Sequence, residues 1–290
     1  MPGWCGKLFE DDGELMSVAD DASARSRLDT GLDTSVSHSA RIWNYWLGGK
    51  DNYEADRIAG DRVAEMLPII VTQARADRAF LGRAIRYLAG EAGLRQFLDI
   101  GTGLPTADNT HEVAQRVAPS SRIVYADNDP LVLTHARALL TSSPQGACDY
   151  IDGDLREPEH ILSEAARTLD SSQPVGLMLL GVLHHIPDTD QAYSIVQRLL
   201  AALAPGSFLT INHSTSAISG AAMEEAVAHW NRVGTPSMTL RTPAQIAVFF
   251  DGLDLLEPGI VSCSRWRPET GPDGELPEEV DEFCGVARKP

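Results

Sequence analysis

Two glycines follow a short apolar segment that carries a single acidic residue. The segment reads Phe97-Leu98-Asp99-Ile100-Gly101-Thr102-Gly103. Glycines at the end of a strand let a ligand approach the backbone, since no Cβ blocks it, and they tolerate positive φ. The Asp99 carboxylate would repel a diphosphate and would suit a ligand that bears an ammonium group. The alternative is that the glycines only shape a strand-to-helix turn, since a lone GxG is a weak signal.

Two further acidic residues follow apolar segments that resemble strands. Asp127, with Asn128 beside it, comes directly after Arg122–Ala126. An acid at this point can accept hydrogen bonds from ribose hydroxyls. Asp154 follows the next such segment, where it can accept from an adenine amino group while the Leu155 N–H donates to the ring. The alternatives are a turn aspartate at the first position and a solvated acidic loop at the second.

A fourth apolar segment leads to Gly181 and to the adjacent pair His184 and His185. Histidine can act as a general base near neutral pH. The alternative is that one imidazole packs structurally and the other is exposed. No third ligand stands at a useful spacing and the cysteines form no CxxC pair, so we expect no metal site.

The elements that must position these residues recur at a regular interval. Asp99, Asp127 and Asp154 are 28 and 27 residues apart, which is about the length of a strand, a crossover helix and two loops. This regularity predicts βαβ units in a parallel sheet, whose carboxyl ends meet at one edge and bind ligands there. The predicted strands are Phe97–Ile100, Arg122–Ala126, Cys148–Ile151, Val175–Leu183, Phe208–Ile211, Leu253–Leu256 and Glu282–Ala287.

The chain divides by composition into three parts. Residues 1–36 are polar and without period, which predicts a mobile tail. Residues 37–95 predict a helical cap, and residues 96–290 predict the α/β domain. The last two predicted strands would form an antiparallel hairpin at the edge of the sheet.

Composition and net charge limit the classes of partner that we expect. The 290 residues carry a formal net charge of −17, which disfavours nucleic acid as a partner because a duplex is densely anionic. No apolar run is long enough to span a bilayer and no signal peptide is evident, so we expect a cytoplasmic protein without membrane contact. A small molecule is the expected substrate, and a homodimer is one option for its assembly.

The glycine turn and the later strand ends resemble the motifs of class I S-adenosylmethionine-dependent methyltransferases. More narrowly, the run from Tyr45 to Arg57 resembles a hallmark of a mostly actinobacterial S-adenosyl methyltransferase family, formerly listed as a domain of unknown function. The segments Arg241–Pro243, Phe250–Leu253 and Glu257–Gly259 are similar to that family too. The resemblance implies S-adenosylmethionine as cofactor. It also implies a Rossmann-like fold with a mostly parallel seven-stranded sheet, a C-terminal antiparallel edge strand and an N-terminal helical extension.

The resemblance also implies that the N-terminal segment closes over the cofactor. Tyr45, Gly49 and Asn52 would then contact it, and Tyr45 joins the two histidines as a candidate base. Aromatic faces interact favourably with a sulfonium. The alternative is that these aromatic side chains only pack the helical segment onto the sheet.

Three functions remain open at this point. The first is a methyltransferase that acts on a small molecule, in which the protein mainly aligns donor and acceptor. The second is a non-catalytic S-adenosylmethionine-binding or regulatory protein, because no known acceptor motif is present. The third is a nicotinamide-dependent dehydrogenase, which Asp99 and the absence of glycine at Thr106 both disfavour.

Overall fold

The structure is a computed structural model that describes residues 33–290, apart from residues 107, 140 and 271–272. Residues 1–32 of the predicted tail lie outside the described residues. The described helices are α2 (Ser39–Trp46), α3 (Glu54–Met66), α4 (Ile70–Gly90), α5 (Thr110–Val117), α6 (Pro130–Leu139), α7 (Pro158–Ala165), α8 (Thr189–Ala202), α9 (Ala221–Val233) and α10 (Pro243–Val248), with short 3₁₀ turns η1 (Leu183–His185) and η2 (Cys263–Arg265).

Within the described residues, eight strands form one sheet in the order β3-β2-β1-β4-β5-β8-β6, with β7 also paired to β8. They are β1 (Gln96–Ile100), β2 (Arg122–Asp127), β3 (Ala147–Asp152), β4 (Gly176–Leu180), β5 (Phe208–Ser214), β6 (Asp254–Leu255), β7 (Val261–Ser262) and β8 (Glu282–Arg288). Strands β1 to β5 are parallel, whereas β8 runs antiparallel to β5, β6 and β7. The predicted mostly parallel sheet with an antiparallel end is therefore confirmed.

The sheet has one strand more than the seven expected. The additional strand is β7, whose two residues pair with Cys284 and Phe283 of β8. Two residues are too few to show an alternating pattern of polar and apolar side chains. The strand predicted over Val175–Leu183 is also shorter, because Gly181 adopts a φ of 64° and the chain then turns into η1.

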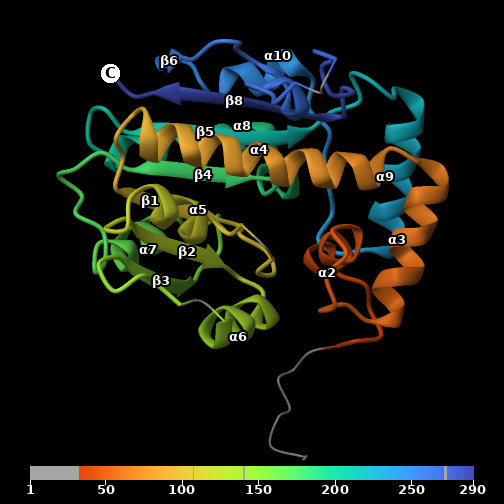
Figure 1. Ribbon diagram of the computed structural model, residues 1–290. Helices are drawn as coiled ribbons and strands as arrows, with labels where there is room; N and C mark the ends of the chain where they lie inside the picture. Colours follow the sequence, from red (N-terminus) through yellow and green to blue (C-terminus); the bar gives the residue numbers. More distant parts are fainter. Residues whose placement is uncertain (1–32, 107, 140, 271–272) are drawn as a thin grey trace, which may run out of the picture. The chain divides into compact units, whose positions relative to one another are not determined.

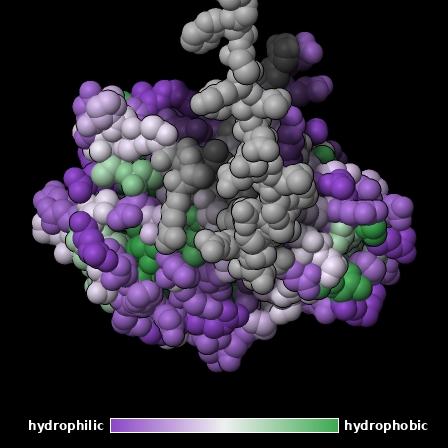
Figure 2. All heavy atoms as spheres, turned by 90° about the horizontal axis from the view of Figure 1, so that it is seen from below, coloured by the Kyte–Doolittle hydropathy of each residue, from purple (hydrophilic) through white to green (hydrophobic). Residues whose placement is uncertain are grey.

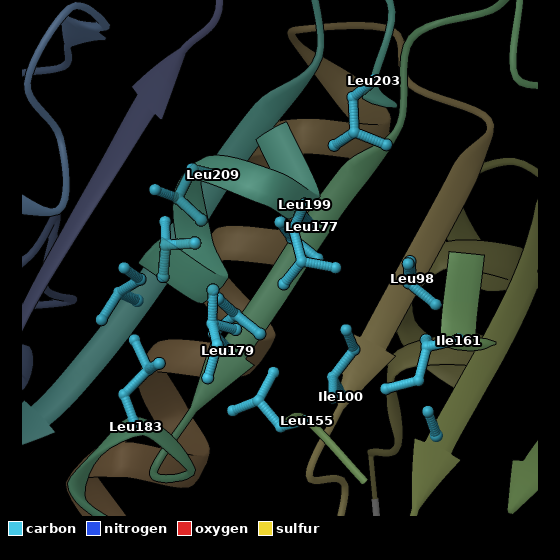
Figure 3. Packing of buried hydrophobic residues seen from close by; sticks show 14 of the residues in the cluster. Leu98, Ile100, Leu155, Ile161, Leu177, Leu179, Leu183, Leu199, Leu203 and Leu209 are labelled. Carbon is cyan, nitrogen blue, oxygen red and sulfur yellow. The ribbon is translucent and has the colours of Figure 1, made fainter. Parts of the chain in front are cut away.

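Helices cover both faces of the sheet (Figure 1). One buried cluster joins strand residues such as Leu98 and Leu177 to α7, α8 and α10, and a second joins Phe97 and Met178 to α4 and α5. Figure 3 shows the first cluster, in which side chains of β1, β4 and β5 pack against those of the covering helices. Burial on both faces explains why β4 reads as a continuous apolar run.

Helices α2, α3 and α9 form a cap beyond the carboxyl ends of the parallel strands (Figure 1). A third apolar cluster unites α3, the first turn of α4 and α9 through residues that include Val63, Ile70 and Met223. Helix α2 is tied to α3 by a buried ion pair, in which Arg41 Nε donates to Asp56 Oδ1 at 3.0 Å. The cap thus includes α9, which comes from the C-terminal part of the chain.

The surface shown in Figure 2 is mostly hydrophilic where described residues are visible, with apolar side chains in separate groups. No described helix has both the length and the apolar character that a bilayer crossing would require.

The layered core predicts a large cost for removing a side chain from the middle of the sheet. Leu177 of β4 is fully buried, so Leu177→Ala is expected to lower the free energy of unfolding by about 2–5 kcal/mol. Urea denaturation followed by circular dichroism measures the change. The matched control is Ile58→Ala on α3, whose side chain is 63% exposed and should shift the value by less than about 0.5 kcal/mol. Equal effects for both variants would contradict the assigned core.

Candidate functional site

A cavity of about 240 Å³ lies between the carboxyl ends of the strands and the cap. Its wall on the sheet side includes Asp99, Gly101, Thr102, Gly103, Asp127, Asn128, Gly181, His184, His185 and Ser214. Its wall on the cap side is mainly apolar and includes Ile42, Trp43, Trp46, Leu47, Val63, Leu67, Met223, Ala226, Val227, Trp230 and Met238. The cavity therefore has a polar half built by strand ends and an apolar half built by helices.

The glycine turn after β1 requires both of its glycines. Gly101 and Gly103 have φ values of 77° and 64°, which side chains rarely adopt. A Cβ on Gly101 would also lie 2.4 Å from Val182 Cγ2, whereas a Cβ on Gly103 would meet nothing within 4 Å. Gly101 therefore permits close packing of two strand ends, and Gly103 leaves the backbone open to a ligand.

Two carboxyls, one buried and one half-buried, flank this turn. Asp99 is 4% exposed and accepts a hydrogen bond from Thr110 Oγ1 at 2.6 Å. Asp127 accepts from the N–H of Gly103 at 3.0 Å and from the N–H of Asp129 at 2.9 Å, so it joins the β2 end to the glycine turn. Burial raises the pKa of each carboxyl to about 6. Asp129 also caps α6, by accepting from the N–H of Leu131 at 2.8 Å.

The structure places Asp154 and Leu155 next to the cavity but not on its wall. The Asp154 carboxylate accepts from Asn128 Nδ2 at 3.2 Å and pairs with Arg156, and Leu155 is buried in the apolar core. Asn128 itself lines the cavity. Contact of Asp154 and Leu155 with an adenine ring remains a prediction.

Three predicted residues of the cap lie away from the cavity wall. The Tyr45 hydroxyl donates to Asp61 Oδ1 at 2.8 Å, and Asn52 Nδ2 donates to Gly49 O at 3.0 Å. A Cβ on Gly49 would lie 2.4 Å from Nδ2 of Asn44, a buried residue that does line the cavity. The structure thus gives Gly49 a packing role behind the wall, and it does not bring Tyr45 to the two histidines.

Both predicted histidines line the cavity. Their rings lie edge to face with centroids 4.3 Å apart. His184 Nδ1 is 3.2 Å from Ser214 Oγ, and His185 Nδ1 is 2.9 Å from Ser237 O. Burial lowers the pKa of His185 to about 4 and holds the pKa of His184 well below its usual value. Both imidazoles are therefore neutral at pH 7.

Sequence analysis missed the contribution of α4 to the site. Gln73 and Asp77 stand four residues apart on this helix, and both line the cavity. Asp77 accepts from Asn212 Nδ2, and burial raises the pKa of Asp77 to about 7. The i, i+4 spacing of two polar residues within an amphipathic helix was the available signal.

The strand order, the glycine turn and the acids at the strand ends define the Rossmann-like fold of class I methyltransferases. Residues 25–290 match the family described as S-adenosyl methyltransferase. The chain belongs to this family, and S-adenosylmethionine is its cofactor.

Two solved structures show the same fold at high sequence identity. A DUF574 family protein from Streptomyces avermitilis MA-4680 is 44% identical, with 89% of this chain and 99% of that chain covered and a TM-score of 0.85. A "putative methyltransferase" from Thermobifida fusca YX is 41% identical, with 89% and 97% covered and a TM-score of 0.80. None of the curated proteins compared with the chain matches it.

The residues on the sheet side fit this cofactor. Gly103 offers backbone that no side chain covers, and the carboxyls of Asp99 and Asp127 supply negative charge beside it. A ligand with an ammonium and a sulfonium would compensate these carboxylates. Ribose hydroxyls can donate hydrogen bonds to the remaining lone pairs of the Asp127 carboxylate.

The raised carboxyl pKa values predict a pH dependence of stability. Between about pH 4 and pH 6, a carboxyl with a raised pKa in the folded state keeps its proton, whereas the same carboxyl in the unfolded chain loses it. The free energy of unfolding therefore falls as the pH rises through this range. Asp99→Asn should abolish the part of this decrease that the Asp99 carboxyl causes. The free energy of unfolding at pH 7 should then rise by roughly 1–3 kcal/mol. Urea denaturation across this pH range measures the slope. Asp251→Asn, at an exposed position, should keep the wild-type slope, and a wild-type slope for Asp99→Asn would refute the assignment.

Proposed function

We propose that the protein transfers a methyl group from S-adenosylmethionine to a small, mainly apolar acceptor that binds in the cap half of the cavity. The observation that supports this proposal is the division of one cavity into two halves. The polar half lies at the strand ends, where α/β folds bind ligands. The other half is lined by tryptophan, methionine and aliphatic side chains, which are typical of pockets for apolar ligands.

The residues of the polar half would hold the cofactor. The glycine turn and Asp99 would take its amino-acid part, and Asp127 with Asn128 would accept from its ribose. When bound, S-adenosylmethionine supplies a methyl group that its sulfonium already activates. The protein therefore has mainly to orient the acceptor and exclude water.

The cap performs both of these tasks. Trp43, Trp46 and Trp230 present large flat surfaces to the cavity, and such surfaces orient an apolar ring and displace water. His184, His185 and Ser214 add polar groups to the wall of the same cavity. An acceptor with an apolar body and one hydroxyl or amino group matches this lining. The acidic charge balance supports a small molecule over a nucleic acid.

Cofactor binding is expected to depend on Asp127. Asp127→Ala removes a charged acceptor and its hydrogen bond to Gly103 of the glycine turn, so the dissociation constants of S-adenosylmethionine and S-adenosylhomocysteine should rise roughly 10- to 100-fold. Isothermal titration calorimetry measures both constants. Asp170→Ala is the matched control, because Asp170 is an exposed turn aspartate that precedes β4. It therefore lies near the amino ends of the parallel strands, whereas the cavity lies at their carboxyl ends. Unchanged affinity in Asp127→Ala would place the cofactor elsewhere.

Acceptor binding is expected to depend on α9. Ala226 is 3% exposed and lines the apolar half, so Ala226→Phe should fill acceptor space. Methyl transfer should fall by roughly tenfold or more, while the affinity for S-adenosylmethionine stays the same. The assay measures transfer of labelled methyl groups to a small-molecule extract of actinobacterial cells.

The control for this experiment is Ala228→Phe, at an exposed position of the same helix. It should transfer methyl groups at the wild-type rate. Transfer by Ala226→Phe at the wild-type rate would contradict the acceptor pocket. Tight cofactor binding without any transfer by the wild-type protein would instead favour a non-catalytic binding protein.

A further inference from the structure

A chain of hydrogen bonds leads from the cavity into the sheet. His184 Nδ1 is 3.2 Å from Ser214 Oγ, and Ser214 Oγ is 2.8 Å from Glu282 Oε2. Ser214 and Glu282 are direct partners across the β5–β8 pairing, so their positions are fixed by the ladder. With Nδ1 engaged by Ser214, Nε2 is the imidazole nitrogen that remains for a ligand in the cavity.

The end of this chain is a buried carboxyl that faces other acids. Glu282 is 1% exposed, and Gln73 Nε2 donates to its Oε2 at 3.1 Å. The charged groups that face it are Asp77 of α4 and Asp281, the residue directly before β8. Burial and these two acids hold the pKa of Glu282 well above its usual value. Its carboxyl thus gains a proton readily, and a positive charge in the cavity would favour its ionised form.

The imidazole in the middle of the chain is a poor place to leave a positive charge. His184 is 6% exposed and faces His185 of η1, His213 of β5 and Arg241. Arg241 Nη1 is itself 2.7 Å from His213 Nε2. All three neighbours and burial oppose an imidazolium, so a proton that arrives at His184 is better passed on than kept.

We propose that His184, Ser214 and Glu282 form a proton relay that takes the acceptor's proton at His184 Nε2 and delivers a proton to Glu282. This inference rests on the proposed methyl transfer. The acceptor oxygen or nitrogen forms its bond to the methyl carbon, the electron pair of the carbon–sulfur bond stays with sulfur, and the acceptor's proton moves to Nε2. The Nδ1 proton then moves to Ser214 Oγ, and the Ser214 hydroxyl proton moves to Glu282 Oε2.

The relay conserves charge within the buried site. Before transfer, the sulfonium is positive and the Glu282 carboxylate is negative. After transfer, the thioether and the carboxylic acid are both neutral, and no imidazolium persists. His184 acts as the catalytic base, whereas Ser214 and Glu282 act through it. The two states differ in the tautomer of His184, which carries its proton on Nδ1 before transfer and on Nε2 afterwards.

The test is the tautomer of His184 in the two cofactor complexes at pH 7. Long-range ¹H–¹⁵N spectra of protein with ¹⁵N-labelled histidine report it, and His184→Gln assigns the signals. We expect mainly the Nδ1–H tautomer with S-adenosylmethionine and mainly the Nε2–H tautomer with S-adenosylhomocysteine, because only the first ligand carries a sulfonium. In Glu282→Gln and in Ser214→Ala this reversal should disappear, whereas thermal melts should show folded proteins.

The matched control is Thr210→Val, which removes another fully buried hydroxyl from the same face of β5. Thr210 takes no part in the hydrogen bonds that link His184, Ser214 and Glu282. It should preserve the reversal of the tautomer. The same tautomer in both wild-type complexes, a charged His184, or a reversal that persists in Glu282→Gln would overturn the relay. Calorimetry on the same samples separates this failure from that of the proposed function, since absent cofactor binding refutes the function, and binding without the reversal refutes the relay alone.

Discussion

Carboxyls held largely out of water, on the cavity wall or directly behind it, are the electrostatic constraint on which the site depends. Asp77, Asp99, Asp127 and Glu282 come from four different elements, and burial raises the pKa of each. Keeping several ionised carboxylates out of water is costly unless cations or hydrogen-bond donors compensate them. A ligand with positive charge recovers part of that cost. We therefore expect the folded protein to bind a cationic ligand more tightly than a neutral ligand of similar shape.

The cap meets a different constraint, because its apolar wall must be held over an open edge of the sheet. The buried pair of Arg41 and Asp56 ties α2 to α3. The side-chain amide oxygen of Asn44 accepts from the N–H of Asp51 at 3.0 Å and from Asn52 Nδ2 at 3.1 Å. Asp51 and Asn52 thus support the wall from behind. Their hydrogen bonds fix the backbone that carries the tryptophans, which is how a polar motif shapes an apolar pocket.

Residues that follow a strand directly could be predicted from sequence, and residues brought in by packing could not. Asp99, Gly103 and Asp127 were identified because parallel strands end at one edge. Glu282 joins the site through antiparallel pairing of β8 with β5, and no local pattern links it to Ser214. In the cap, the family resemblance of the run from Tyr45 to Arg57 implied ligand contact, but the direction of each side chain depends on how α2 packs on α3.

This division also bears on how specificity can change within the family. The half proposed for the cofactor is built from turns whose glycine conformations and strand pairing are mutually dependent, since a Cβ on Gly101 would collide with Val182 of the neighbouring strand end. The half proposed for the acceptor is lined by side chains of α2, α3 and α9. Substitutions there alter the volume and shape of the pocket without disturbing the strand ends. Relatives that share the sheet and the cofactor can therefore differ in acceptor through a few helix positions.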